Sequence, residues 1–188
     1  MPLKLALFAS GSGSNTENII QYFSHSSTFI FSVIISNKKD AFVHERAKKF
    51  NIPSATFSRE DFVAGEPVLN FLKEHEIDAV VLAGFLLKVP EILIHAFPDK
   101  IINIHPALLP KYGGKGMYGH HVHEAVAASG DTESGITIHY VNEHYDEGNI
   151  IFQATCPVLS TDTPELIAEK VHALEYEHFP RVIGEIWG

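Results

Sequence analysis

An asparagine and a histidine lie two positions apart in the segment Asn103–Pro110, which reads Asn-Ile-His-Pro-Ala-Leu-Leu-Pro. The apolar pair before it predicts the end of a buried strand, and Pro106 ends that strand because proline has no N–H for the ladder. Side chains two positions apart on an extended chain point to the same side. We therefore expect Asn103 and His105 to lie side by side at the carboxyl end of a strand, where α/β sheets bind ligands.

The two side chains have different chemical capabilities. A carboxamide N–H can donate to a developing oxyanion, and an imidazole can move a proton near neutral pH. The alternative is that Asn103 and His105 only satisfy backbone groups of a tight turn. A third candidate is Asp146, in a seven-residue connection between two later strands. It either faces His105 as a carboxylate partner or is a solvated turn former.

A loop of small residues, Ser10–Thr16, joins the predicted strand 3–9 to a helical pattern. Its backbone N–H groups would face outward at the start of a helix, an arrangement that suits a phosphate. Thr16 stands where the third glycine of a dinucleotide fingerprint would fall, and no Gly-Lys-Ser/Thr ends the loop. The next strand, 29–35, ends without the acid that would bind a ribose diol, so a nicotinamide cofactor is disfavoured. The loop predicts a monophosphate site, with a turn that binds nothing as the alternative.

Strands and helices alternate along most of the chain. The expected strands are 3–9, 29–35, 52–57, 77–83, 100–104, 135–141 and 150–154. The expected helices follow residue 16 and cover 41–50, 67–75, 90–97, 123–128 and 163–187. This order predicts an α/β fold with a Rossmann-like, mostly parallel sheet, right-handed crossovers and helices on both faces. The strand at 150–154 is expected to return as the antiparallel partner of the strand at 135–141.

Composition and charge narrow the class of protein. The 188 residues, 45% hydrophobic and 20% charged, predict one domain with a substantial core. The formal charge of −9 at pH 7 argues against a nucleic-acid-binding surface. The start of the chain has no signal-peptide layout, and no apolar run reaches membrane-spanning length. We therefore expect a cytoplasmic protein whose partners are small molecules, with no nucleic acid and no membrane.

Neither the clustered histidines nor the cysteine predicts a metal site. His120, His121 and His123 lack the His-Glu-x-x-His spacing and have no Cys or acid at the usual zinc spacing. Cys156 is the only cysteine, which excludes an internal disulfide framework and a multi-cysteine zinc site. It precedes Pro157 at a predicted strand end, and we interpret it as a structural residue.

The motif Asn-Ile-His-Pro-Ala-Leu-Leu-Pro is very similar to the active-site segment of the folate-dependent formyltransferases. The resemblance covers essentially the whole chain, in the family's order, and implies a single formyltransferase domain over residues 1–188. Within the family, the loop Ser10–Asn15 resembles the phosphate loop of the branch that formylates 5'-phosphoribosylglycinamide. The tRNA-formylating and deformylase branches are less similar, because they carry an additional RNA-binding or regulatory domain.

The resemblance implies an activity and two substrates. The amine of 5'-phosphoribosylglycinamide, or glycinamide ribotide, would attack the formyl group of 10-formyltetrahydrofolate, a step of de novo purine biosynthesis. The folate is a co-substrate, and the resemblance implies no metal. The expected partners are these small molecules, with a homodimer left open.

The resemblance also implies a role for each matching residue. The catalytic residues would be Asn103, His105 and Asp146. The phosphate and ribose of the ribotide would be held by Gly11, Ser12, Gly13, Ser14, Asn15, Lys170, His172 and Glu175. The folate would contact Arg59, Leu86, Leu87, Val89, Asn103, His139, Asn142, Glu143, Tyr145 and Asp146.

Two other functions remain open at this point. A folate hydrolase would use the same three catalytic residues with water as the acceptor, but water needs no phosphate loop. A non-catalytic domain that binds a phosphorylated metabolite would keep the fold, but the presence of all three catalytic-type residues argues against it.

Overall fold

The structure is a computed structural model that describes residues 1–188, and its centre is one seven-stranded sheet. The strands are β1 (Leu3–Phe8), β2 (Phe29–Ser36), β3 (Ser54–Thr56), β4 (Ala79–Leu82), β5 (Ile101–His105), β6 (Glu133–Tyr140) and β7 (Ile150–Pro157). The helices are α1 (Ser14–Tyr22), α2 (Val43–Lys49), α3 (Arg59–Ala64), α4 (Glu66–Glu74), α5 (Glu91–Ala96), α6 (His120–Ser129) and α7 (Pro164–Trp187).

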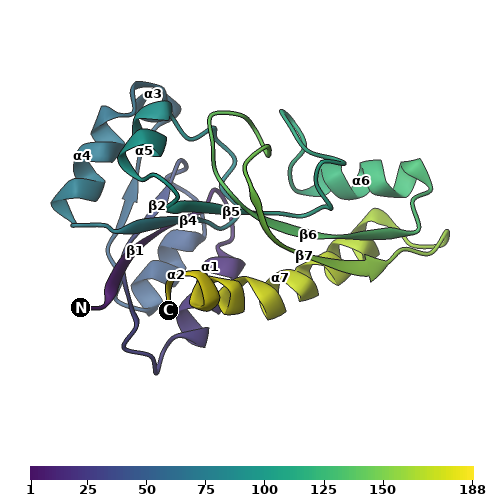
Figure 1. Cartoon of the computed structure of the whole chain (residues 1–188), viewed down its shortest axis with the longest axis horizontal. Coiled ribbons are helices and arrows are strands. Elements are labelled where there is room, and N and C mark those ends of the chain that lie inside the picture. Colours follow the sequence, from purple (N-terminus) through teal and green to yellow (C-terminus); the bar gives the residue numbers. More distant parts are fainter.

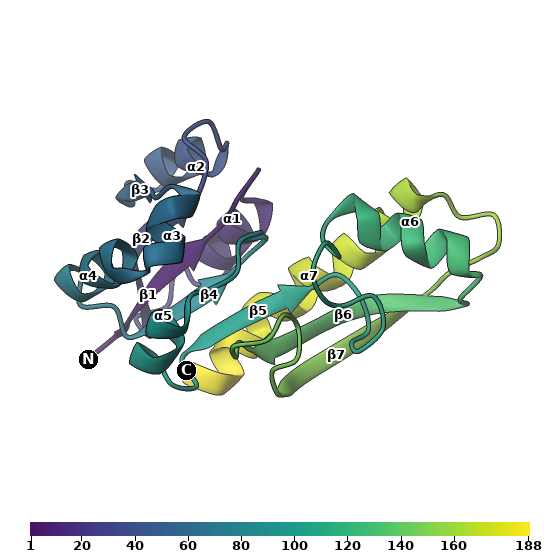
Figure 2. The ribbon, with the colours of Figure 1, turned by 90° about the horizontal axis from the view of Figure 1, so that it is seen from above.

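The order of strands in the sheet is β3-β2-β1-β4-β5-β6-β7. The first five are parallel, and β6 and β7 are antiparallel to their neighbours. The predicted mostly parallel α/β sheet is therefore confirmed, including the antiparallel pair at its end. In Figure 2, β6 and β7 reach beyond the parallel strands toward α6.

Helices cover both faces of the sheet (Figure 1), because each buried strand has two apolar faces. Along β1, Leu5 and Leu7 pack into a cluster of 25 buried residues that α1, α2 and α7 share. Ala6 and Phe8, which alternate with them, belong to a second cluster of 16 buried residues beneath α3, α4 and α5. The sheet is thus packed on both faces, and this packing fixes the positions of the side chains at its strand ends.

The chain reverses its direction across the sheet at β1. It first builds outward through β2 and β3, and then returns to add β4 and β5 on the other side of β1. Connections that leave neighbouring strands in opposite directions create a crevice at the carboxyl ends of those strands. In this protein the crevice lies beyond the ends of β1 and β4.

Helix α7 packs against α1, α6, β6 and β7, so it connects the first helix of the chain to the antiparallel strands at the end of the sheet. Its start is as predicted: the Thr163 hydroxyl accepts a hydrogen bond from the Leu166 N–H, and Pro164 occupies the first turn. The predicted start of α6 was wrong by one turn. The helix begins at His120 rather than His123, after Gly119 turns the chain with a φ of 53°. None of the helices combines the length and the apolar character needed to cross a membrane.

Candidate active site

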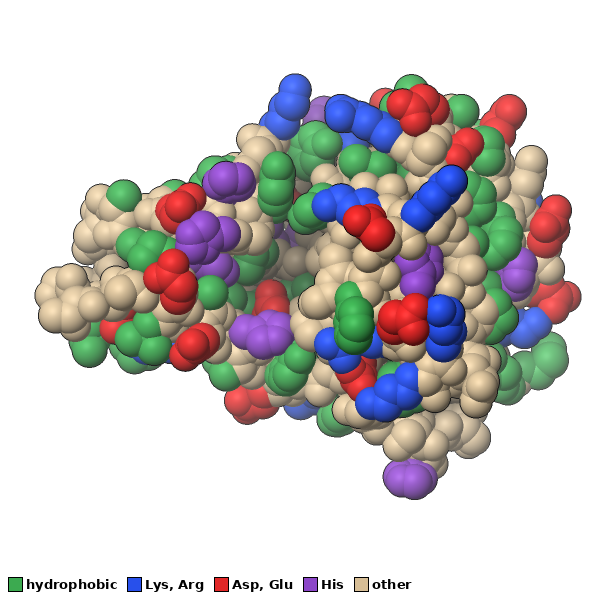
Figure 3. Space-filling model, turned by 180° about the vertical axis from the view of Figure 1, so that it is seen from behind, with side chains coloured by type: hydrophobic (Ala, Val, Ile, Leu, Met, Phe, Trp, Pro, Cys, Tyr) green, Lys and Arg blue, Asp and Glu red, His purple; other side chains and the backbone are tan.

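A cavity of about 1000 Å³ opens at the carboxyl ends of β1, β4 and β5. Figure 3, which shows the side opposite to Figure 1, shows a hollow between two parts of the molecule with histidine side chains gathered beside it. The cavity extends from the loop Gly11–Asn15 at one end to Asn103, His105, His139 and Asp146 at the other. We call these the glycine end and the histidine end; the glycine end also includes His172 and Glu175.

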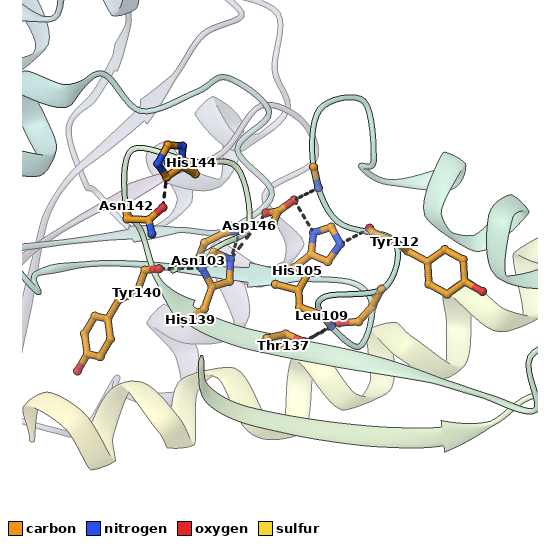
Figure 4. Close-up of polar contacts among 12 residues, drawn as sticks. Asn103, His105, Leu109, Tyr112, Thr137, His139, Tyr140, Asn142, His144 and Asp146 are labelled. Carbon is orange, nitrogen blue, oxygen red and sulfur yellow. Dashed lines mark hydrogen bonds and ion pairs between the residues drawn. The ribbon is translucent and has the colours of Figure 1, made fainter. Parts of the chain in front are cut away.

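The histidine end is built on two neighbouring strands (Figure 4). Asn103 and His105 lie two positions apart on β5, and the register of the antiparallel pair places His139 of β6 directly opposite Asn103. The predicted strand continues through His105, so Pro106 ends it one residue later than expected. Only 3% of His105 and 2% of His139 is exposed, so neither imidazole can turn freely.

His139 holds the amide of Asn103 in one orientation. Its Nδ1 lies 2.8 Å from the Tyr140 carbonyl oxygen, which can only accept, so Nδ1 carries the proton. Burial lowers the pKa of His139 below its ordinary value, which favours the neutral ring. The bare Nε2 then accepts from the Asn103 amide nitrogen at 3.1 Å. The amide's second N–H remains available as a donor.

Asp146 reaches this end from the connection between β6 and β7. Its backbone has a φ of 56°, the left-handed region, which Asp adopts more readily than most residues. One carboxylate oxygen, Oδ2, accepts from the Gly114 N–H at 2.9 Å and lies 3.7 Å from His105 Nδ1. The other, Oδ1, lies 3.8 Å from His139 Nε2. Both imidazole distances exceed a hydrogen bond, and each pair becomes an ion pair only when its ring is protonated.

The glycine end presents the backbone of small residues at the start of α1. Gly13 has a φ of 70°, and a Cβ there would lie 2.4 Å from Val43 Cγ2. Only glycine permits this close approach of the loop to α2. Ser10 anchors the loop, because its hydroxyl donates to Asn37 at 2.6 Å and accepts from the Leu86 N–H at 2.9 Å. The loop is thereby tied to the ends of β2 and β4.

Helix α7 completes the glycine end. Glu175 Oε2 accepts from the Asn15 amide nitrogen at 2.9 Å and lies 2.8 Å from His172 Nδ1. The amide oxygen of Asn15 is buried and has no partner. A carboxylate, an amide and an imidazole beside a helix N-terminus can bind a molecule that carries both hydroxyl groups and an anion.

An apolar wall joins the two ends. The loop after β4 contributes Leu86, Leu87 and Val89, and the β6–β7 connection contributes Tyr145. Arg59, at the start of α3, and Lys88, within the loop after β4, are cations that also line the cavity. Apolar walls with a few convergent polar groups are typical of sites for aromatic small molecules.

Two of the predicted site residues lie away from the cavity. Lys170 turns to the other side of α7, where its ammonium donates to Asp162 and to the Pro157 carbonyl oxygen. The Asp162 carboxylate is almost fully buried and needs this cation. Glu143 pairs with His95 at 3.1 Å on the outer side of its loop. The other predicted residues all line the cavity: Gly11, Ser12, Gly13, Ser14, Asn15, Arg59, Leu86, Leu87, Val89, Asn103, His105, His139, Asn142, Tyr145, Asp146, His172 and Glu175.

The cavity also contains residues that the sequence did not single out as ligands. His123 is 6% exposed, its Nδ1 has no partner, and burial lowers its pKa. Lys38, Lys115 and His144 add polar groups from three different loops. No signal in the sequence pointed to this role, because the helix was predicted to begin at His123 and its burial is known only from the structure. No group of three or more His, Cys, Asp or Glu side chains is arranged to hold a metal ion.

Comparison with known proteins places this site in context. Residues 3–183 match the family described as formyl transferase. The chain is 42% identical to the chloroplastic phosphoribosylglycinamide formyltransferase of Arabidopsis thaliana over 97% of its length, and it spans 65% of that relative. It is 36% identical to the phosphoribosylglycinamide formyltransferase of Haemophilus influenzae, with 96% of this chain and 85% of that protein covered.

The solved structures agree with the sequence comparison. The fold matches glycinamide ribonucleotide transformylase 1 from Geobacillus kaustophilus with a TM-score of 0.91, at 32% identity and with the whole of both chains covered. The phosphoribosylglycinamide formyltransferase from Anaplasma phagocytophilum matches with a TM-score of 0.88, at 36% identity over 97% of this chain and 86% of that one. The likeness of fold therefore extends over the whole chain, including the seven-stranded sheet.

Proposed function

This chain belongs to the formyl transferase family, and we propose that it transfers a formyl group from 10-formyltetrahydrofolate to the amine of 5'-phosphoribosylglycinamide in purine biosynthesis. One observation carries the proposal. A single cavity joins the small-residue loop Gly11–Asn15 at the start of α1 to the Asn103, His105 and Asp146 group. A ribotide whose phosphate binds at the glycine end can extend its amine toward the histidine end.

The reaction requires a change of bonds at one carbon. The amine nitrogen bonds to the formyl carbon, and the bond from that carbon to N10 of the folate breaks. One proton leaves the attacking nitrogen and one arrives on N10, so the products are N-formylglycinamide ribotide and tetrahydrofolate. Because the cavity holds both substrates, their proximity contributes to the rate.

Asn103 supports the step in which negative charge develops on the formyl oxygen. Its second amide N–H is free to donate to that oxygen, since the first is held by His139. A donor that is already oriented needs no reorganisation when the charge appears. His105, in its cationic form, would add a positive charge beside the same oxygen.

Asp146 and His105 provide the route for the proton. The carboxylate can accept the proton that the amine loses, directly or through water, and the imidazole can return one to the leaving nitrogen. The distance of 3.7 Å between Oδ2 and Nδ1 lets each group sense the charge of the other. Asp146 is also anchored by the Gly114 N–H, which keeps it ordered near the imidazole.

The apolar wall fits the ring system of a folate. Leu86, Leu87 and Val89 offer an apolar surface beside the histidine end, and Arg59 offers a cation for a carboxylate tail. When bound there, the folate supplies the formyl carbon as an electrophile. The residues of this chain hold it, orient it against the amine and exclude water.

A formyl-folate hydrolase is the second candidate function. It would use the same histidine end, but it leaves the glycine end without a purpose. The Asn15–Glu175–His172 contacts favour the transferase, because they build a second binding site at a distance from the reacting groups.

The test is formyl transfer measured with and without the ribotide. Loss of the formyl donor that depends on glycinamide ribotide is the expected result, with N-formylglycinamide ribotide detected in equal amount. Equal loss in the blank without ribotide would identify a hydrolase. No loss in either reaction, with the protein folded, would contradict the proposal.

A further inference from the structure

The loop after His105 makes a contact that determines which ring nitrogen of His105 carries a proton. His105 Nε2 lies 2.7 Å from the backbone carbonyl oxygen of Tyr112 (Figure 4). A carbonyl oxygen only accepts hydrogen bonds, so Nε2 must be the donor. In the neutral ring the other nitrogen, Nδ1, is then unprotonated, and Nδ1 is the nitrogen that faces Asp146.

Tyr112 presents its carbonyl through an unusual backbone conformation. Its φ is 55°, in the left-handed region that costs a non-glycine residue about 1 kcal/mol. A residue retains such a conformation when its surroundings hold it there. The carbonyl is therefore held in place rather than left to a relaxed loop.

The side chain of Tyr112 supplies that hold. Its hydroxyl lies 2.7 Å from the Asp131 carboxylate and 2.7 Å from the Ser129 hydroxyl, both just beyond α6 or at its end. Lys111 donates to the same carboxylate at 3.0 Å. In Figure 4 the ring of Tyr112 extends away from His105, so it contacts the imidazole only through the backbone.

The same loop also holds the acid. Two residues after Tyr112, the Gly114 N–H donates to Asp146 Oδ2 at 2.9 Å. One short segment therefore contacts both members of the pair, with a carbonyl on the base and an N–H on the acid. Its anchoring sets both the identity of the facing nitrogen and its distance from the carboxylate.

We propose that Tyr112 is a positioning residue, clamped by Asp131 and Ser129, whose carbonyl fixes the Nε2–H tautomer of His105 and leaves Nδ1 as the nitrogen that exchanges protons. The role of this nitrogen in the reaction rests on the proposed function. The tautomer itself is a property of the protein without substrates, and it can be measured separately.

The experiment uses ¹⁵N-histidine-labelled protein and compares Tyr112→Phe and Asp131→Ala with the unaltered chain. The ring nitrogens of His105 are identified by the signals that disappear in His105→Asn. Tyr22→Phe is the matched control, since it removes a hydroxyl from an exposed tyrosine at the end of α1. Urea unfolding checks that each variant is folded.

The unaltered protein and the control are expected to show His105 protonated at Nε2 when the ring is neutral. In both clamp variants the fraction protonated at Nδ1 rises, and kcat for formyl transfer falls roughly tenfold to a hundredfold while both KM values stay within about twofold. The double variant is expected to show the same kcat and the same tautomer fraction as each single variant, because both substitutions remove the same Tyr112–Asp131 contact.

Three outcomes would overturn the proposal. The first is that neutral His105 carries its proton on Nδ1 in the unaltered protein. The second is that the Tyr112 and Asp131 variants keep the Nε2–H tautomer. The third is that the effects of the two substitutions on kcat add fully in the double variant. Asp131 is partly exposed, so Asp131→Ala provides the measurement should Tyr112→Phe fail to fold. If the unaltered enzyme shows no formyl transfer at all, the proposed function fails while the tautomer result still decides the clamp.

Discussion

The two ends of the cavity are built in different ways. At the histidine end, the functional groups are side chains, and three of the four residues lie on neighbouring strands with their ring and amide orientations fixed by hydrogen bonds. At the glycine end, the loop offers mainly backbone N–H groups, and its shape depends on the absence of a side chain at Gly13. Proton transfer requires a single donor or acceptor atom to be correctly placed, so its side chain must be held in one orientation. An anion can instead be bound by several backbone N–H groups at once.

This difference predicts how each end responds to substitution. Changes at the histidine end should lower kcat chiefly through the loss of the oriented functional groups. Changes at the glycine end should raise KM for the ribotide and also destabilise the fold. The backbone conformation that would bind the anion is the same one that lets the loop pack against α2.

The largest effect is expected for Asp146→Asn. The substitution keeps the size of the side chain and its acceptor for the Gly114 N–H, but removes the charge that faces His105. We expect kcat to fall by about 10²- to 10⁴-fold, the usual contribution of a proton-transfer group. Steady-state kinetics with both substrates measures this, and a rate within a few-fold of the original would contradict the role in proton transfer.

Gly13→Ala tests the glycine end. The added Cβ would lie 2.4 Å from Val43 Cγ2 at a φ of 70°, so the loop must move or strain. We expect a loss of about 1–3 kcal/mol in the free energy of unfolding and a rise of roughly tenfold in KM for the ribotide. Gly11→Ala is the stability control, because a Cβ there meets no atom within 4 Å. Equal destabilisation by the two substitutions would show that steric fit to α2 does not shape this loop.

The pH dependence of stability sharpens the account of the histidine end. Burial lowers the pKa of His139 in the folded protein below its ordinary value of 6.5, so the unfolded chain takes up the proton first as the pH falls. The free energy of unfolding should therefore decrease below about pH 6.5, by at most about 1.4 kcal/mol per pH unit from this group, until the folded protein is also protonated. Urea unfolding between pH 7.5 and about pH 5 should show a shallower decrease in His139→Asn. An unchanged slope would mean that His139 is not buried in its neutral form.

The smallest effect on substrate kinetics is expected for Lys170→Ala. Because its ammonium contacts Asp162 and the Pro157 carbonyl, KM for the ribotide should change by no more than about twofold, as for other substitutions outside a site. His172→Ala, two positions along the same helix, should raise that KM several-fold because His172 lines the cavity. If Lys170→Ala raised KM more than His172→Ala, the lysine would have to reorient toward the ribotide when it binds.

The fold was predictable because its signals are local. Apolar runs of strand length, the small-residue loop after β1 and the Thr163-Pro164 start of α7 each determine one element, and the alternation of elements determines a mostly parallel sheet. The placement of Asn103 and His105 on the same side of β5 was predictable in the same way, because side chains two positions apart on a strand point to the same face.

The remaining parts of the site depend on contacts between distant segments. No spacing rule places Asp146 beside His105, because that contact requires the β6–β7 connection to fold back over the end of β5. Lys170 and His172 lie on one helix, and only the packing of α7 decides which of them faces the cavity. The Tyr112 carbonyl carries no signal in the sequence at all, since every residue has one.

The contact between Asn15 and Glu175 joins residues that are 160 positions apart. On the ribosome, the loop after β1 emerges early and waits for α7, which is made after all seven strands. A nascent chain therefore cannot complete the glycine end, the proposed ribotide site, until α7 has emerged and docked. If the ribotide binds there, it would stabilise only chains in which α7 has docked. Its binding free energy would then favour the complete fold over partly synthesised chains.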